Sequence, residues 1–160
     1  QFGSLIALCH KGSPIVGVID MPILRERWVG VLGVGTTLNG IPQRTRAAVD
    51  IGEARMGCTT LEMFTEPRAI SSFNQLRAQV HDCNFGGDCY NYAVLSSGFL
   101  DIVLETSLKP WDFAAIVPVI LAAGGSITDW EGRPLLLSSA GHVIASSDSA
   151  LHRQVLPFLK

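Results

Sequence analysis

The strongest constraint on the fold is a change of hydrophobic pattern near residue 50. Before it, two apolar and partly β-branched runs, 2–9 and 15–19, flank the turn-forming residues 10–14. A third run at 27–32 precedes an Asn39-Gly40 pair, which is typical of a tight hairpin. This spacing predicts an antiparallel meander. Runs this apolar are expected to be covered on both faces.

After residue 50, expected strands and helices alternate, which is typical of an α/β layer. Pro118 lies inside one expected helix and has no backbone N–H, so we expect a kink near it. We therefore predict an α/β fold in which an antiparallel-sheet portion, 1–50, is followed by a smaller α/β portion, 51–160. The expected strands are 56–60, 100–104, 127–130 and 142–145, and the expected helices are 67–80, 88–95, 111–123 and a last one capped by residues 147–148.

The composition limits the partners. There are 12 Lys and Arg against 14 Asp and Glu, a net charge of −2, which gives no support for a nucleic-acid or membrane-surface partner. No apolar run reaches the roughly 18 to 20 residues of a membrane span. Charged residues make up 16% of the chain, below the usual quarter or so. Such a low fraction suggests that surface is buried against a partner subunit, so we predict a homodimer.

The cysteines and histidines show no ligand spacing. Cys9, Cys58, Cys83 and Cys89 lie far apart and form no C-x-x-C pair. We interpret them as buried thiols in a reducing cytoplasm. The chain also lacks the P-loop, G-x-S-x-G and H-E-x-x-H motifs.

Three acidic residues stand at strand and helix ends. Asp88 follows two glycines at an expected helix start, Glu105 follows an expected strand, and Asp112 begins the next helix. Taken singly, an acid at a helix start is explained by capping. Taken together, they point to the edge of an α/β sheet where strand ends and helix starts gather and ligands bind. Such an edge suits Mg²⁺ with oxygen ligands, and a substrate phosphate.

Two segments near the C-terminus carry a family resemblance. Residues 109–115, KPWDFAA, followed by 122–132, AAGGSITDWEG, closely resemble the W-D-x-A-A, A-G-G and T-D-x-x-G signature of the inositol monophosphatase family. The segments 3–8, 17–22 and 38–40 resemble the family's strands that follow its main metal motif, so the resemblance covers essentially the whole chain.

Residues 86–92, GGDCYNY, depart from the G-[ST]-A-A-like stretch of inositol phosphatases and resemble the histidinol-phosphatase branch of the family, as do Phe113 and the run 117–119.

The resemblance implies a sugar-phosphatase type fold and Mg²⁺-dependent hydrolysis of a small phosphate monoester. Histidinol phosphate is the favoured substrate, which implies a role in histidine biosynthesis, and inositol 1-phosphate is the alternative. By resemblance, Asp112 matches a metal-ligating acid that also contacts substrate. Glu105 matches the acid that holds the polar end of the substrate, and Asp88 matches a substrate-contacting position.

Several motifs of the family that this sequence resembles are not found in residues 1–160. The family's acidic helix, its Glu pair and its D-P-[IL]-D-G-T motif would precede residue 1 and are not in the sequence. We therefore expect the catalytic residues and most metal ligands in a missing N-terminal segment, and assign no catalytic residue here. The 160-residue chain alone is expected to be inactive. A further alternative is a catalytically incomplete fragment that only folds and dimerises.

Overall fold

The first part of the chain forms an antiparallel sheet, as its pattern predicts. The computed structural model describes residues 2–47 and 50–159. Neighbouring strands of this sheet are joined in sequence order, and Asn39 and Gly40 both have positive φ, at 49° and 84°, in the last hairpin. This geometry is the tight turn that an Asn-Gly pair favours. The strands are β1 (Ser4–His10), β2 (Ser13–Met21), β3 (Glu26–Val31), β4 (Gly35–Leu38) and β5 (Ile41–Gln43).

Only one face of this first sheet is well covered. Ile19 and Trp28 point into the core and are almost fully buried. On β1, Ile6 and Leu8 are 63% and 58% exposed. The expectation that both faces are covered is therefore wrong for the described residues, because successive side chains alternate between the two faces and helices pack on one of them.

The second part of the chain is a mixed sheet with helices on both faces, as expected for an α/β layer. Its strand order is β7-β6-β8-β10-β9, with β6 parallel to β7 and β8, and β10 antiparallel to β8 and β9. The strands are β6 (Arg55–Cys58), β7 (Asp82–Phe85), β8 (Ile102–Glu105), β9 (Ser126–Thr128) and β10 (Val143–Ser146). Strand β7 was not predicted, because its sequence, DCNF, has only a short and partly polar pattern.

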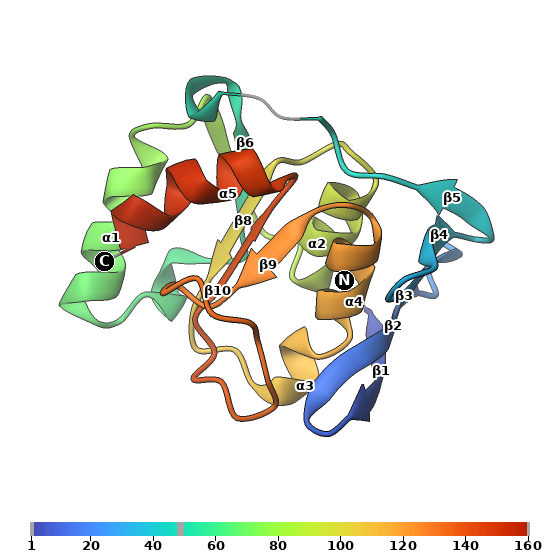
Figure 1. Cartoon of the computed structure of the whole chain (residues 1–160). Helices are drawn as coiled ribbons and strands as arrows, with labels where there is room; N and C mark the ends of the chain where they lie inside the picture. The colour runs from blue at the N-terminus through green and yellow to red at the C-terminus, as the bar shows by residue number, and fades with distance from the viewer. Residues whose placement is uncertain (1, 48–49, 160) are drawn as a thin grey trace.

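The helices separate the layers. In Figure 1, α1 and α5 lie side by side on one face of the second sheet, while α2 and α4 lie between the two sheets. The α-helices are α1 (Pro67–Arg77), α2 (Cys89–Ser96), α3 (Pro110–Phe113), α4 (Ile116–Ala122) and α5 (Ser149–Val155). Short 3₁₀ turns lie at η1 (Ile51–Glu53), η2 (Leu61–Met63) and η3 (Leu156–Leu159). No helix in residues 2–47 and 50–159 is both long and apolar enough to cross a bilayer.

The expected single helix 111–123 is divided in two, and Pro118 explains the division. Helix α3 ends at Phe113 and α4 begins at Ile116. A proline removes the hydrogen bond to the carbonyl four residues earlier and crowds that carbonyl, which here belongs to Ala114. The predicted kink is confirmed, one turn before the proline.

The divided helix packs against two glycines of the first sheet. Gly17 and Gly30 face each other on β2 and β3. A Cβ on Gly17 would lie 1.9 Å from the carbonyl oxygen of Ala115, and one on Gly30 would lie 2.4 Å from the Cα of Val119. The absence of side chains at both positions therefore lets the helix backbone pack directly against the first sheet.

An ion pair with the buried Asp101 holds residues 45–46, which follow the first sheet. Asp101 is fully buried and accepts hydrogen bonds from Nε and Nη2 of Arg46 at 2.9 and 2.8 Å, and from the backbone N–H of Arg55 at 2.9 Å. The backbone N–H of Thr45 donates to the carbonyl of Ala123 at 3.1 Å. These bonds hold residues 45–46 against the second sheet.

Two apolar clusters form the core. One, between the two sheets, joins Ile19 and Trp28 to Tyr92 and Val103. The other lies between the second sheet and the helices α1 and α5, and contains Ile102 and Leu104. Strand β8 is thus buried on both faces. The division at residue 50 into two domains stays a prediction, and the first cluster contains residues from both sides of that boundary.

Candidate functional site

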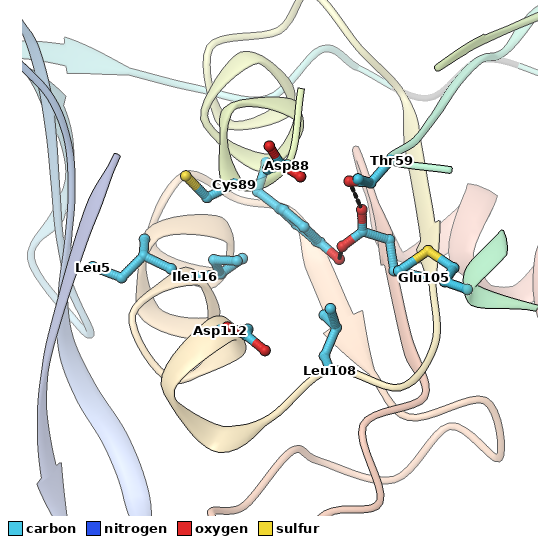
Figure 2. Close-up of a pocket in the computed structure, with 10 residues that line it drawn as sticks. Leu5, Thr59, Asp88, Cys89, Glu105, Leu108, Asp112 and Ile116 are labelled. Carbon is cyan, nitrogen blue, oxygen red and sulfur yellow. Dashed lines mark hydrogen bonds between the residues drawn. The ribbon is translucent and has the colours of Figure 1, made fainter. Parts of the chain in front are cut away.

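A pocket of about 350 Å³ brings the three predicted acids together. Asp88, Glu105 and Asp112 all line it, and Figure 2 shows that they reach it from different sides. Because β6 and β8 run parallel, their carboxyl ends meet at one edge of the sheet, where α2 and α3 also begin. The sequence-based expectation that these residues gather at such an edge is confirmed as geometry. The roles assigned to them by resemblance stay predictions.

Glu105 forms the inner wall of the pocket. It ends strand β8 and is only 3% exposed. The hydroxyl of Thr59, just after β6, donates to its Oε1, and the hydroxyl of Tyr92 donates to its Oε2 at 2.9 Å. Burial raises the pKa of the Glu105 carboxyl, the two hydroxyl donors lower it, and the negative charge of Asp88 raises it further.

Asp112 is both a helix cap and a pocket residue. One carboxylate oxygen accepts the backbone N–H of Lys109 at 2.7 Å, which satisfies a free donor at the start of α3. Its other oxygen has no hydrogen-bond partner among the residues that the structure describes, and the side chain lines the pocket. Capping and ligand binding are therefore compatible at this position, because they use different oxygens.

Asp88 does not cap its helix through its side chain. It stands at the start of α2, but its carboxylate makes no capping hydrogen bond, so the capping interpretation is wrong for this residue. Its φ is +47°, a region that side-chain-bearing residues rarely adopt, and it is exposed. The side chain of Asn91 donates to the carbonyl of Gly86 at 2.8 Å and holds this turn in place. An unused carboxylate on a strained turn beside a pocket is typical of a ligand-binding position.

The pocket has no balancing positive charge. Of the described residues that line it, three are acids and none is Lys, Arg or His. Carboxylates without a counter-ion attract cations, such as a metal ion or a substrate amine. The oxygen donors are of the kind that Mg²⁺ prefers. Across residues 2–47 and 50–159, however, no three His, Cys, Asp or Glu side chains converge to hold a metal ion.

Sequence reasoning missed two polar residues of this pocket. Thr59 directly follows β6, and its position at the same sheet edge as Glu105 could have identified it. Tyr92 lies four residues after Asp88, one helical turn along α2, so the helical period could have placed both on one side. Cys89 and Met63 also line the pocket.

The four cysteines are free thiols. Cys58 is buried, and burial raises the pKa of its thiol to about 12, so it stays protonated and unreactive. The other three are half-buried rather than buried, which partly corrects the sequence-based expectation.

The chain is similar to phosphatases of one family. The family model described as "Inositol monophosphatase family" matches residues 1–159. The chain is 45% identical to the bifunctional phosphatase IMPL2, chloroplastic, of Arabidopsis thaliana, over 99% of this chain and 48% of that protein. It is 29% identical to the histidinol-phosphatase of Chlorobaculum parvum, over 97% of this chain and 59% of that protein.

The solved structures agree in fold. An inositol monophosphatase from Zymomonas mobilis superimposes with a TM-score of 0.96 at 42% identity, over 99% of this chain and 62% of that one. The inositol monophosphatase from Anabaena superimposes with a TM-score of 0.88 at 25% identity, over 99% of this chain and 64% of that one. The chain thus spans about half to two thirds of the length of these relatives.

Proposed function

The chain belongs to the inositol monophosphatase family, and on that premise we propose that the protein hydrolyses a small phosphate monoester, with histidinol phosphate as its substrate. The observation that carries the proposal is the pocket whose charged residues, among those that the structure describes, are the acids Asp88, Glu105 and Asp112. Histidinol phosphate carries an amine and an imidazole at the end away from its phosphate, and both can be cationic. A neutral polyol would leave Asp88 and Glu105 without a charged partner.

The similar proteins support phosphatase activity more strongly than they support histidinol phosphate as the substrate. The histidinol-phosphatases are 28–29% identical to this chain, whereas the Zymomonas mobilis inositol monophosphatase is 42% identical. Inositol 1-phosphate therefore stays the second candidate. Its hydroxyls could donate hydrogen bonds to the same carboxylates, but they bring no positive charge to pair with them.

Asp112 would contribute one ligand to Mg²⁺ through its unpaired carboxylate oxygen. When bound, the metal ion would neutralise charge on the phosphoryl group and activate a water molecule. Glu105 and Asp88 would hold the far end of the substrate and so orient the ester. This chain supplies a single proposed metal ligand, and the others are expected outside it.

The test is phosphate release from histidinol phosphate and inositol 1-phosphate, with Mg²⁺ and with a chelator, using the full-length protein. We expect Mg²⁺-dependent turnover with a higher kcat/KM for histidinol phosphate. A higher kcat/KM for inositol 1-phosphate would favour the second candidate. Absence of turnover with either ester would refute the proposed function.

The 160-residue chain by itself is expected to show no Mg²⁺-dependent phosphatase activity, since Mg²⁺ keeps its waters unless several carboxylate and phosphate oxygens replace them. Turnover that tracks this chain through purification, and that is lost in Asp112→Asn, would contradict this expectation. If the chain is the whole gene product, the incomplete-fragment alternative applies.

We also propose that the protein forms a homodimer and works in a reducing compartment. The exposed Ile6 and Leu8 on β1 support a partner surface, which sedimentation analysis would test. The free thiols fit a reducing compartment. The similar Arabidopsis protein is described as chloroplastic, which favours a plastid over the predicted cytoplasm.

A further inference from the structure

Two hydroxyl groups hold the carboxylate of Glu105 from opposite sides. Tyr92, fully buried on α2, donates to Oε2 at 2.9 Å, and Thr59, after β6, donates to Oε1. The dashed lines of Figure 2 mark these bonds. Each carboxylate oxygen therefore has one fixed donor and keeps acceptor capacity for a ligand.

The surroundings of Glu105 oppose its ionisation. Burial and the charge of Asp88 both raise the pKa of the Glu105 carboxyl. The other titratable side chains that line the pocket or are coupled to Glu105 are Asp112, Tyr92 and the thiols of Cys58 and Cys89, and none of these can supply a positive charge. The hydroxyls of Thr59 and Tyr92 lower this pKa, as does the backbone of Thr59, so the two hydroxyls favour the ionised and oriented carboxylate.

A purely structural role would not require this arrangement. A buried tyrosine hydroxyl needs one acceptor, and a backbone carbonyl would serve as well. Tyr92 instead donates to a carboxylate that lines the pocket, and it lies one helical turn after Asp88. The hydroxyl thus links the helix that carries one acid of the site to the orientation of another.

We propose that Tyr92 and Thr59 are positioning residues that keep the Glu105 carboxylate aimed into the pocket, and that they thereby set a preference for substrates whose non-phosphate end is cationic. This inference rests on the proposed phosphatase function and deepens it. Neither hydroxyl reacts. Each acts through Glu105, whose contact with an amine or imidazolium would be made in both the ground state and the transition state.

The test is Tyr92→Phe in the full-length protein, which removes the hydroxyl and keeps the ring. We expect KM for histidinol phosphate to rise about tenfold with kcat little changed, because a charge-assisted contact is weakened. KM for inositol 1-phosphate should change little. The acid limb of the pH profile of kcat/KM for histidinol phosphate should move to higher pH, since loss of the donor raises the pKa of Glu105.

The chain offers a matched control on the same helix. Tyr90 also donates to a glutamate, Glu26, at 3.1 Å, but it does not line the pocket. Tyr90→Phe should therefore leave KM, the substrate ratio and the pH profile unchanged. An equal change in both tyrosine variants would indicate a general effect on α2 and would overturn the inference. If Tyr92→Phe does not fold, Thr59→Val removes the other donor and should show the same signature.

Calorimetry separates this inference from the proposed function. Histidinol, which has the amine and imidazole but no phosphate, should bind the wild-type protein about tenfold more tightly than Tyr92→Phe, and Glu105→Gln should bind it as weakly. If the wild type hydrolyses neither ester, the function fails and this binding difference still decides the inference. Equal histidinol affinity in wild type and Tyr92→Phe, or an unchanged substrate ratio in an active enzyme, would overturn it.

Discussion

Replacing Arg46 by alanine should destabilise the protein far more than replacing Arg27, although both arginines form short ion pairs with an aspartate. Arg46 Nη2 lies 2.8 Å from Asp101, whose side chain is 0% exposed. Arg27 Nε lies 2.7 Å from Asp20, and those side chains are 62% and 22% exposed. The two pairs are similar in distance, but Asp101 is fully buried and accepts two bonds from Arg46, whereas Asp20 is partly exposed and accepts one from Arg27.

The expected magnitude follows from what Arg46→Ala leaves behind. Breaking a buried pair leaves an uncompensated buried charge, which costs about 3–5 kcal/mol. Here the Arg46 side chain is 35% exposed and the backbone N–H of Arg55 still donates to Asp101, so we expect about 2–4 kcal/mol. For 160 residues, at about 2–4 °C per kcal/mol, a loss of ~3 kcal/mol lowers Tm by roughly 6–12 °C.

The control and the rescue make the prediction specific. Arg27→Ala should cost at most about 1 kcal/mol, as exposed pairs do. Adding Asp101→Asn to Arg46→Ala removes the unpaired charge and should recover part of the loss. Urea denaturation of the wild type and these three variants, read by circular dichroism, supplies the comparison. If Arg46→Ala loses no more stability than Arg27→Ala, the reasoning about the buried Asp101 is wrong.

Further predictions concern the site, the pH dependence and the packing. Asp112→Asn keeps an oxygen for the cap of α3 but should lower turnover by orders of magnitude at limiting Mg²⁺; near-normal rates across a Mg²⁺ titration would refute its role as a ligand. Asp88→Ala should lower kcat/KM about ten- to a hundredfold for histidinol phosphate and little for inositol 1-phosphate, with an unchanged Tm because its carboxylate caps nothing. Burial lowers the pKa of His152 from 6.5 to about 4, so as the pH falls the unfolded state takes up a proton before the folded state does. Stability should therefore be full above about pH 6.5 and fall by roughly 3 kcal/mol toward pH 4. Urea midpoints at pH 7.5 and 4.5 should differ less in His152→Gln than in the wild type, and an equal difference would exclude this histidine as the cause. Gly30→Ala places a Cβ against the backbone of α4 and should lower the free energy of unfolding by about 1–3 kcal/mol. Gly52→Ala, whose added Cβ has its nearest contact at 4.0 Å, should leave that free energy nearly unchanged, and thermal unfolding of both variants tests the difference.

The sequence determined those features that depend on local chemistry. Apolar, partly β-branched runs separated by turn-forming residues predicted the meander, because both signals act within a few residues of the chain. The Asn39-Gly40 turn followed from the ease with which these residues adopt positive φ. The position of Pro118 predicted the kink, because the missing N–H acts on the same helix. Strand ends and helix starts located Asp88, Glu105 and Asp112 on one edge.

Tertiary structure decided what depends on contacts between distant segments. Strand β7 has little pattern of its own and forms because β6 offers it a parallel edge. Whether Asp88 caps α2 was open in the sequence, since a carboxylate at a helix start can turn toward the backbone or away from it. The sequence could place Thr59 and Tyr92 near the site, but it could not show their hydrogen bonds to Glu105, which span 46 and 13 residues. Such pairings are set by how the layers pack, which no local pattern records.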